Sequence, residues 1–256
     1  MKQDRKILII GDSIIDRTCL CEVTINPDDF LVPSYNLHSY YDNPGGGLNA
    51  LRQMTKLVDD QKAIVYKGWI PNNCVNFEDR LDRYASHNIY ITKNIDLYPK
   101  VMRYQSNDIS SKPLFRIDIS NLLCSCCQTL NDTTVQYVLV SQYQYRPELI
   151  HMNCLVDYLS VQEIVVDTRR PELWWDWEGN NLTIKCTMYE WSKHQKYRDK
   201  LLKHHIIVTD GPYSVHNYTP GGTYRIFPVP IVKVVNTMGA GDIFSAAYTA
   251  ARYKGY

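Results

Sequence analysis

Several features that would assign this sequence to a particular class of protein are missing from it. No stretch approaches the roughly 18 consecutive apolar residues that a membrane-spanning helix requires, so we expect no membrane partner. The net charge is only +1, and no excess of positive charge steers the chain toward nucleic acid. Residues 1–6 lead straight into a strand-like run, without the apolar core of a secretory signal. We therefore expect a cytoplasmic protein.

The cysteine pattern also lacks what a metal site or a disulfide framework would need. The chain holds eight cysteines, and Cys124, Cys126 and Cys127 stand close together. A closed zinc site requires two pairs of cysteine or histidine ligands, and no second pair at ligand spacing stands near this cluster. In a cytoplasmic protein of this length, reduced thiols are the simpler interpretation.

What the sequence does contain is a regular alternation of apolar runs and amphipathic stretches. The amphipathic stretches cover residues 76–87, 146–160 and 190–203, and a helix is expected over Gly45 to Leu57. The apolar runs fall at residues 6–10, 63–66, 135–140, 163–167 and 205–209. This alternation predicts an α/β fold with a doubly wound, mostly parallel sheet and helices on both faces. We expect a single domain over residues 1–256.

Two segments depart from this alternation. Residues 18–42 mix β-branched and aromatic residues with two prolines, and residues 98–118 have the pattern of paired short strands with a turn at residues 106–112. We expect short strands there, which leave the main sheet and form a small β lid.

Glycines and an aspartate near the C-terminal end carry the strongest chemical signal. A strand-like run, Ile231 to Val235, leads to Gly239-Ala240-Gly241, and a helix-forming run begins at Asp242. Such a turn presents free backbone N–H groups at a helix start, which suits an anion. A carboxylate beside an anion site is what phosphoryl transfer to a hydroxyl needs. A helix start with an ordinary first-turn carboxylate is the alternative. Neither a Walker A loop nor a complete dinucleotide fingerprint is present.

Two further stretches belong to the same predicted edge of the sheet. Gly11 to Arg17 follows the first strand and supplies Asp12 and Asp16, whose carboxylates can accept hydrogen bonds from sugar hydroxyls. Gly45 and Gly46 precede the first helix, whose first turn carries Asn49. A loop with a capping aspartate, and a loop followed by a helix, are the simpler interpretations of these two stretches.

Together these stretches resemble the ribokinase-like (PfkB) carbohydrate kinases. Thr237, Gly239, Ala240, Gly241 and Asp242 match the signature Asp-Thr-x-Gly-Ala-Gly-Asp, with Asn236 in place of the first aspartate. The resemblance implies that Asp242 is the general base and that the Gly-Ala-Gly amides form the anion hole.

The order of the motifs resembles the bacterial heptose-7-phosphate kinases in particular. Gly-Asp-x3-Asp-Arg, Pro-Gly-Gly-x2-Asn and Gly-Ala-Gly-Asp occur in that order, and a strand end at Asp167 and a Val-Thr-x-Gly at 208–211 fit the same group. The resemblance implies a sugar or sugar-phosphate substrate. It assigns substrate binding to Asp12, Asp16, Gly45, Gly46 and Asn49, and contact with a sugar phosphate to Arg103 or Arg116.

The same resemblance implies ATP with Mg²⁺, leaves room for a monovalent cation, and favours a homodimer formed through the β lid. Glu190 would order the magnesium ion. Nucleotide contacts would fall on Thr187, Thr209, Gly211 and Thr237.

Four departures from the family pattern keep other interpretations open. Thr187 replaces an asparagine, Ser141-Gln142 stands where an aspartate is usual, Asn236 lacks a charge, and the chain ends at Tyr256, soon after Asp242. The early end predicts an incomplete adenine pocket unless another chain completes it. The alternatives are a non-catalytic kinase-like protein that binds a sugar phosphate or nucleotide, and a kinase for a nucleoside or vitamin alcohol.

Overall fold

The computed structural model describes residues 5–25, 33–70, 89–93, 100–106, 115–119, 134–142, 155, 160–234 and 237–256. The cysteine cluster at 124–127, the amphipathic stretch 76–87, most of the stretch 146–160, and Asn236 lie outside these residues. For Asp12 and for the strands around Arg103 and Arg116, only the backbone is described.

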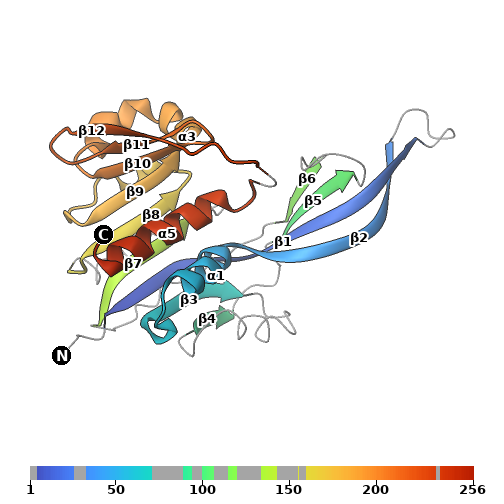
Figure 1. The fold of residues 1–256 in the computed structure, drawn as a ribbon, viewed down its shortest axis with the longest axis horizontal. Helices are drawn as coiled ribbons and strands as arrows, with labels where there is room; N and C mark the ends of the chain where they lie inside the picture. Colours follow the sequence, from blue (N-terminus) through green and yellow to red (C-terminus); the bar gives the residue numbers. More distant parts are fainter. Residues whose placement is uncertain are drawn as a thin grey trace.

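A long sheet forms the centre of the molecule (Figure 1). Its strands follow in the order β12 (Tyr224–Pro228), β11 (Ser214–Tyr218), β10 (His205–Asp210), β9 (Leu182–Thr187), β8 (Glu163–Thr168), β7 (Val135–Gln142), β1 (Lys6–Ile25), β3 (Ile64–Ile70) and β4 (Ile89–Lys93). Neighbours from β10 to β4 run parallel, and β11 and β12 add an antiparallel hairpin at one edge. The predicted doubly wound, mostly parallel sheet is confirmed.

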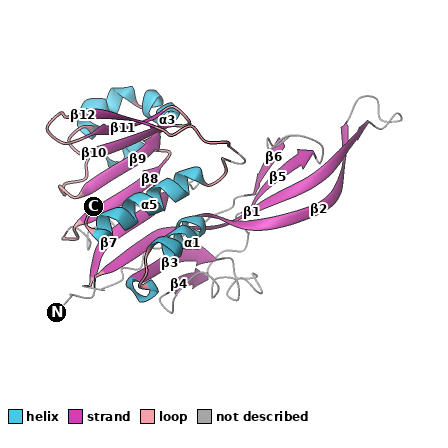
Figure 2. Ribbon diagram, viewed as in Figure 1, coloured by secondary structure: helices cyan, strands magenta, loops and turns pink. Residues whose placement is uncertain are grey.

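Helices cover both faces of this sheet, as Figure 2 shows by colour. Those described are α1 (Gly47–Leu57), α3 (Met188–Lys193), α4 (Arg198–Leu201) and α5 (Ala240–Lys254), with short 3-10 turns at Gln61–Ala63, Pro171–Trp174 and Gln195–Tyr197. No helix among them is long and apolar enough to cross a membrane. The amphipathic stretch at residues 190–203 is broken into α3, a 3-10 turn and α4 rather than one helix.

The two faces bury separate apolar cores because side chains alternate along each strand. On β1, Ile7 and Ile9 belong to the core beneath α1 and α5, whereas Leu8 and Ile10 belong to the core on the other face, with Trp174. All four side chains are buried. Continuous apolar runs such as residues 6–10 are the expected sequence of strands buried on both sides.

Strand β1 is longer than the sequence predicted, and its second half builds the lid. We expected the strand to end at Gly11-Asp12, but it extends over 20 residues to Ile25. Beyond Asp12 its partners change from β3 and β7 to β2 (Pro33–Gly46) and β5 (Lys100–Ser106), and β6 (Phe115–Ile119) pairs with β5. We call residues 13–25 together with β2, β5 and β6 the lid; it projects as an arm from the main sheet in Figure 1.

The strand predicted before the Gly-Ala-Gly turn is not found in residues 231–234, the part of it that the structure describes. Ile231–Val234 carries no strand pairing and is exposed, although its composition is that of a strand. Pro228 and Pro230 precede it, and a proline has no N–H group to donate to a strand ladder. The chain therefore leaves the sheet at β12 before it returns to begin α5.

Candidate active site

The carboxyl ends of the parallel strands and the first turns of two helices meet at one edge of the sheet. Asp167 lies near the end of β8, Thr187 ends β9, and Thr209 lies one residue before the end of β10. Helices α1 and α5 contact each other and begin at this edge. In open α/β sheets this edge is where ligands bind. The three stretches that the sequence singled out are therefore brought together here.

Gly239 shapes the turn that leads into α5. It caps the helix in the left-handed conformation, with φ of 73°, and no side chain caps the helix start. A Cβ at this position would overlap Nδ2 of Asn49. Only glycine satisfies both conditions without strain, because a positive φ and close contact both exclude a side chain. Asn49 in turn donates a long hydrogen bond to the Gly239 carbonyl, at 3.4 Å.

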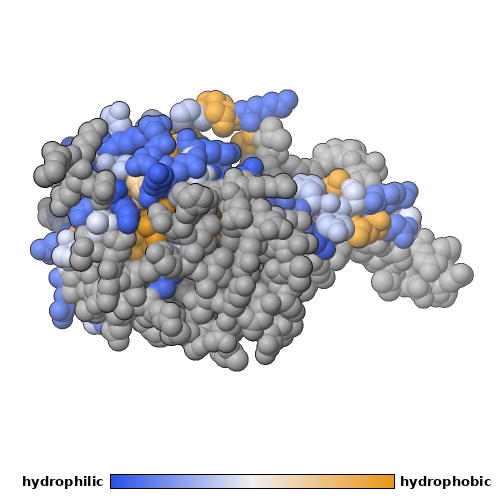
Figure 3. All heavy atoms as spheres, turned by 90° about the horizontal axis from the view of Figure 1, so that it is seen from below, coloured by the Kyte–Doolittle hydropathy of each residue, from blue (hydrophilic) through white to orange (hydrophobic). Residues whose placement is uncertain are grey.

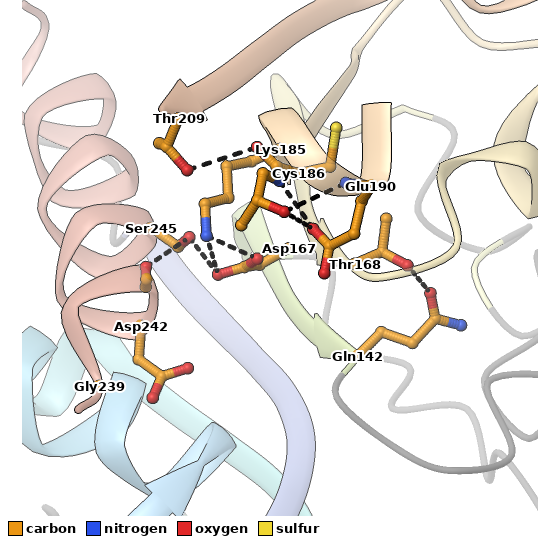
Figure 4. Close-up of polar contacts among 12 residues, drawn as sticks. Gln142, Asp167, Thr168, Lys185, Cys186, Glu190, Thr209, Gly239, Asp242 and Ser245 are labelled. Carbon is orange, nitrogen blue, oxygen red and sulfur yellow. Dashed lines mark hydrogen bonds and ion pairs between the residues drawn. The ribbon is translucent and has the colours of Figure 1, made fainter. Parts of the chain in front are cut away.

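Asp242 lies in the first turn of α5 and faces α1 (Figure 4). Its Oδ2 accepts a hydrogen bond from Nδ2 of Asn49 at 2.9 Å, across 193 positions of sequence. Its Oδ1 is buried and has no hydrogen-bond partner among the described residues. The carboxylate is thus fixed through one oxygen, while the other is available to accept a proton.

Burial raises the pKa of Asp242 to about 7. Desolvation is the main cause, and the negative charge of Asp167 adds to it. The hydrogen bond from Asn49 and the positive charges of Lys185 and Arg169 act in the opposite direction. A carboxyl group that titrates near neutral pH can accept a proton from a hydroxyl and later release it.

A buried ion pair lies beside Asp242, also visible in Figure 4. Nζ of Lys185 on β9 donates to both carboxylate oxygens of Asp167 on β8, at 2.9 and 3.0 Å. Oγ of Ser245, one turn after Asp242 on α5, donates to Oδ2 of Asp167 at 2.6 Å. Sequence reasoning missed Lys185 and Ser245. The available signal was a lysine inside the otherwise uncharged strand Leu182–Thr187.

Thr187 and Glu190 form a capping box at the start of α3. The Thr187 backbone N–H and hydroxyl both donate to Oε2 of Glu190 at 2.7 Å, and the Glu190 N–H donates back to the Thr187 hydroxyl at 3.3 Å. Thr187, which stands where the resembled pattern has asparagine, therefore caps the start of α3. Thr209 donates to the carbonyl of Cys186 at 3.4 Å.

Strand pairing also brings the predicted sugar-binding residues together. Gly45 and Gly46, at the end of β2, pair with Ile14 and Ser13 of β1. A Cβ at Gly45 would lie 3.5 Å from Cβ of Asp16, so these two positions are neighbours. Asp12 lies on the same strand, at the point where β1 leaves the main sheet.

The remaining predicted contacts lie at the margins of this edge. Arg103 on β5 and Arg116 on β6 are directly paired across the two lid strands. Gly211 takes a positive φ of 52° in the turn after β10. Thr237 is exposed before α5, and its carbonyl accepts the N–H of Ala240 at 3.2 Å.

Gln142 follows Ser141 at the end of β7, where the family pattern has an aspartate. Its Oε1 accepts hydrogen bonds from the Thr168 hydroxyl at 2.7 Å and from the Trp174 indole at 3.0 Å. Both partners are buried on the face opposite α5. This amide therefore supports the core rather than the edge that carries Asp242.

The cavity of about 330 Å³ between α4 and the β11–β12 hairpin is a separate feature. Arg198, Tyr218 and Tyr224 line it. Tyr218 pairs with Ile206 near the start of β10, so the cavity lies at the end of the sheet opposite to Asp242.

Comparison with known proteins bears on the fold and on the C-terminal part of the sequence. Residues 182–256 match the sequence model of the pfkB family carbohydrate kinases. No curated protein matches the chain in sequence. Among solved structures, a ribokinase from Thermotoga maritima superimposes with a TM-score of 0.74 at 16% identity, covering 98% of this chain and 86% of that one. This chain has the ribokinase-like fold.

Two other structures with the ribokinase-like fold were solved with ligands. Ribokinase from Arabidopsis thaliana, complexed with ribose and ATP, has a TM-score of 0.68 at 13% identity, covering 98% of this chain and 86% of that one. A nucleoside kinase from Burkholderia thailandensis, complexed with inosine, has a TM-score of 0.66 at 15% identity, covering 98% and 85%. The match to the pfkB family includes Asp242 and its glycine turn.

Proposed function

We propose that this chain is a pfkB-family kinase that transfers a phosphoryl group from ATP to a hydroxyl of a sugar or sugar phosphate. The family match over the segment that contains Asp242, and the ribokinases of the same fold, support this proposal. Within that class we favour a heptose-7-phosphate-like acceptor, because of the order of the glycine and aspartate motifs in the sequence.

The observation that carries the proposal is the environment of Asp242. One oxygen is held by Asn49, the other is buried without a partner among the described residues, and the pKa is raised to about 7. A general base needs a fixed orientation, an available lone pair and a pKa near the working pH. In our proposal, Oδ1 accepts the proton of the acceptor hydroxyl as that oxygen attacks the phosphoryl group.

The uncapped N-terminal ends of α1 and α5 carry partial positive charge, and we propose that they bind the transferred phosphoryl group. Neither helix has a side-chain cap, and they begin at Gly47 and Ala240 on the same edge of the sheet. The first N–H groups of a helix have no partner within the helix, and they favour an anion. The Ala240 N–H already donates to the Thr237 carbonyl. In the proposed anion hole, the N–H groups of Gly239 and Gly241 can therefore bind the anion without breaking that bond.

Magnesium fits this site as an ion brought in with ATP rather than as a resident metal. No group of three or more His, Cys, Asp or Glu side chains that could hold a metal exists among the described residues. Mg²⁺ commonly uses one or two carboxylates together with substrate phosphates, and when bound it neutralises charge on those phosphates. We assign Glu190 as the residue that orders it, because this carboxylate lies one turn after the end of β9.

The acceptor would lie between Asp242 and the base of the lid. Asp16, Gly45, Gly46 and Asn49 are brought to that region by the pairing of β1 with β2 and by α1. Arg103 and Arg116 occupy directly paired backbone positions in the lid, and we propose them as the contact with a phosphate on the acceptor, since arginine is the common partner of phosphate groups. A nucleoside is the main competing acceptor, since a nucleoside kinase complexed with inosine has the same fold.

An assay of ADP release tests the proposal and its acceptor together. ATP and Mg²⁺ would be supplied with a panel of heptose, hexose and pentose phosphates, free sugars and nucleosides. We expect the highest kcat/KM for a sugar phosphate of the heptose class. Preference for a nucleoside would overturn the acceptor assignment, and ADP release that no acceptor stimulates would overturn the proposed function.

One observation favours a second candidate, a non-catalytic protein that binds a sugar phosphate or nucleotide. The Glu190 oxygen that accepts both bonds from Thr187 is engaged in capping α3. A thermal-shift series separates the two candidates, because a ligand stabilises the state it binds. Additional stabilisation when ATP-Mg²⁺ joins the sugar supports the kinase, whereas stabilisation by sugar alone supports the binding protein.

We further propose that the lid mediates a homodimer. Strands β2 and β6 are the outer strands of the lid among the residues that the structure describes. Leu37 and Tyr40 on β2 are both 54% exposed. Unpaired strand edges with exposed apolar side chains are commonly covered by another chain.

A further inference from the structure

Lys185 is the least expected residue of the central sheet. It lies in β9 between Ile184 and Cys186, which are fully buried, and it is itself only 1% exposed. A charged lysine is almost never buried to this degree unless it is paired, because the interior solvates an ammonium group poorly. Its position at the active-site end of the sheet therefore calls for an explanation.

The carboxylate of Asp167, the partner of Lys185, joins β8, β9 and α5 through hydrogen bonds. Asp167 on β8 accepts hydrogen bonds from Lys185 with both oxygens, and Ser245 on α5 donates to one of the same oxygens. Ser245 lies three residues after Asp242, so the two share a face of α5. A carboxylate fixed by the sheet thus anchors the helix turn that presents Asp242.

The same groups determine the electrostatic field at Asp242. Among the described residues, the charged groups that act on it are Asp167, which raises its pKa, and Lys185 and Arg169, which lower it. Asn49, from α1, lowers it through a neutral hydrogen bond. Arg169 is exposed, so solvent screens its charge, whereas the side chains of Lys185 and Asp167 are 2% and 3% exposed.

We propose that Asp167, Lys185 and Ser245 form a positioning cluster that holds the first turn of α5 against the sheet and balances the charge felt by Asp242. The inference rests on the proposed function in one respect, namely that Asp242 is the base. The three residues act through Asp242 and are positioning residues. Asp167 holds Ser245 in place, and Lys185 offsets the charge that Asp167 would otherwise impose.

Removing the charge of Lys185 and removing the charge of Asp167 should shift the pKa of Asp242 in opposite directions. A purely structural role of the two residues predicts no such opposition. Lys185→Met leaves Asp167 uncompensated and should raise the pKa of Asp242, by about one unit. Asp167→Asn leaves Lys185 uncompensated and should lower it by a similar amount. The double variant Asp167→Asn/Lys185→Met should return it close to the wild-type value. Arg169→Gln, which removes an exposed charge, is the matched control and should shift it far less than Lys185→Met does.

Two measurements would follow these shifts. The acidic limb of the pH profile of kcat reports the ionisation of the base during turnover. A ¹³C NMR titration of the aspartate carboxyl carbons, assigned with Asp242→Asn, reports the same pKa without any substrate. If the NMR shifts occur in a protein without turnover, the kinase proposal fails while the positioning cluster stands. If both single variants shift the pKa in one direction, or leave it unchanged, the cluster proposal is overturned.

Ser245→Ala tests the anchoring role and keeps the proposal testable should the charge variants not fold. It removes no charge, and it removes both contacts of the Ser245 hydroxyl, the bond to Asp167 at 2.6 Å and the longer one to the Gly241 carbonyl at 3.1 Å. We expect hydrogen exchange of the amides between Gly241 and Ser245 to become at least tenfold faster, relative to the amides at the far end of α5. Unchanged exchange in this turn would contradict the anchoring role.

Discussion

At the scale of single residues, the buried carboxyl group of Asp242, our proposed base, is expected to lower stability at neutral pH. Its pKa in the folded protein is about 7, against an ordinary value of 3.8 for an aspartate side chain. Between these two pH values the folded state holds a proton that the unfolded chain has already released. The contribution of Asp242 to stability is therefore greatest below about pH 4 and decreases as the pH rises to 7.

The variant Asp242→Asn should consequently be more stable than the wild type at neutral pH. An asparagine oxygen can still accept the hydrogen bond from Asn49, and no buried carboxylate has to ionise. The difference should be small near pH 4 and grow toward pH 7, up to about 4 kcal/mol. Urea unfolding at pH 4, 5.5, 7 and 8 measures it. A difference that stays constant across this range would contradict the raised pKa.

Gly239 offers a second prediction at this scale. Gly239→Ala should strongly reduce turnover, because a Cβ would overlap the Asn49 amide and displace the partner of Asp242. Gly222→Ala is the matched control: Gly222 also has a positive φ, of 89°, but a Cβ there would meet open space. Steady-state kinetics and thermal unfolding of both variants separate strain from displacement. Equal activity losses in the two variants would show that the contact with Asn49 is unimportant.

Single residues also show how far the sequence alone could reach. That the glycine turn, Asp242 and Asn49 lie together could be predicted from the sequence, because each stands in a motif of fixed spacing. Lys185 and Ser245 could not, because their roles depend on Asp167, which meets them only after three separate elements pack together. The capping role of Thr187 could have been anticipated, since threonine followed three residues later by glutamate is a capping-box pattern.

At the scale of elements, α5 is held at both ends. Its first turn is anchored through Ser245, and its last two turns contact Glu163 at the start of β8. Glu163 is 5% exposed. Its carboxylate accepts hydrogen bonds from Thr183 at 2.6 Å, Tyr248 at 3.0 Å and Arg252 at 2.7 Å. This second anchor fixes the direction of the helix across the sheet.

Glu163→Gln should therefore destabilise the protein by on the order of 1–3 kcal/mol, because a buried acceptor loses its charge and part of its hydrogen bonding. Lys254→Ala is the control on the same helix. Lys254 pairs with Asp59 at 3.6 Å, and the Asp59 side chain is 99% exposed, so its loss should cost less than about 1 kcal/mol. Urea denaturation gives both values. Similar values for the two variants would argue against the second anchor.

The strands show where pattern reasoning fails at this scale. Apolar runs located the buried strands because burial on both faces leaves an uninterrupted signal. The extension of β1 into the lid left no such signal, since polar residues such as Asp16 and Arg17 continue the strand. In contrast, Ile231–Val234 has a strand-like composition but follows two prolines and stays unpaired. Whether these segments form strands therefore depends on the availability of a pairing strand rather than on their composition.

At the scale of the whole molecule, the lid separates this chain into a main sheet and a projecting arm. Figure 3, a view from below, shows small hydrophobic areas on the described surface, one of them on the lid arm. Placing β2 and β5 beside β1 required contacts between distant parts of the chain, which no local pattern specifies. The sequence nevertheless predicts strands in the lid, from the composition of residues 18–42 and from the turn within residues 98–118.

The proposed dimer gives a prediction at this scale. Leu37→Lys, on the outer strand of the lid, should convert the dimer to a monomer, because a charge would be buried in the interface. Ile226→Lys on β12 is the matched control, since Ile226 has the same exposed fraction of 54%. Sedimentation velocity at several concentrations measures the state of each protein. A wild type that is monomeric throughout would overturn the proposed dimer.

The measurement that tests the central claim most directly is turnover of Asp242→Asn beside the wild type. Phosphoryl transfer from ATP-Mg²⁺ would be followed with the best acceptor found in the panel. Asp59→Asn serves as the control for loss of an aspartate, because its side chain is almost fully exposed. We predict that Asp242→Asn reduces kcat by on the order of 10² to 10⁴, while Asp59→Asn leaves it unchanged. An Asp242→Asn protein that is folded and turns over at the wild-type rate would contradict the assignment of Asp242 as the base.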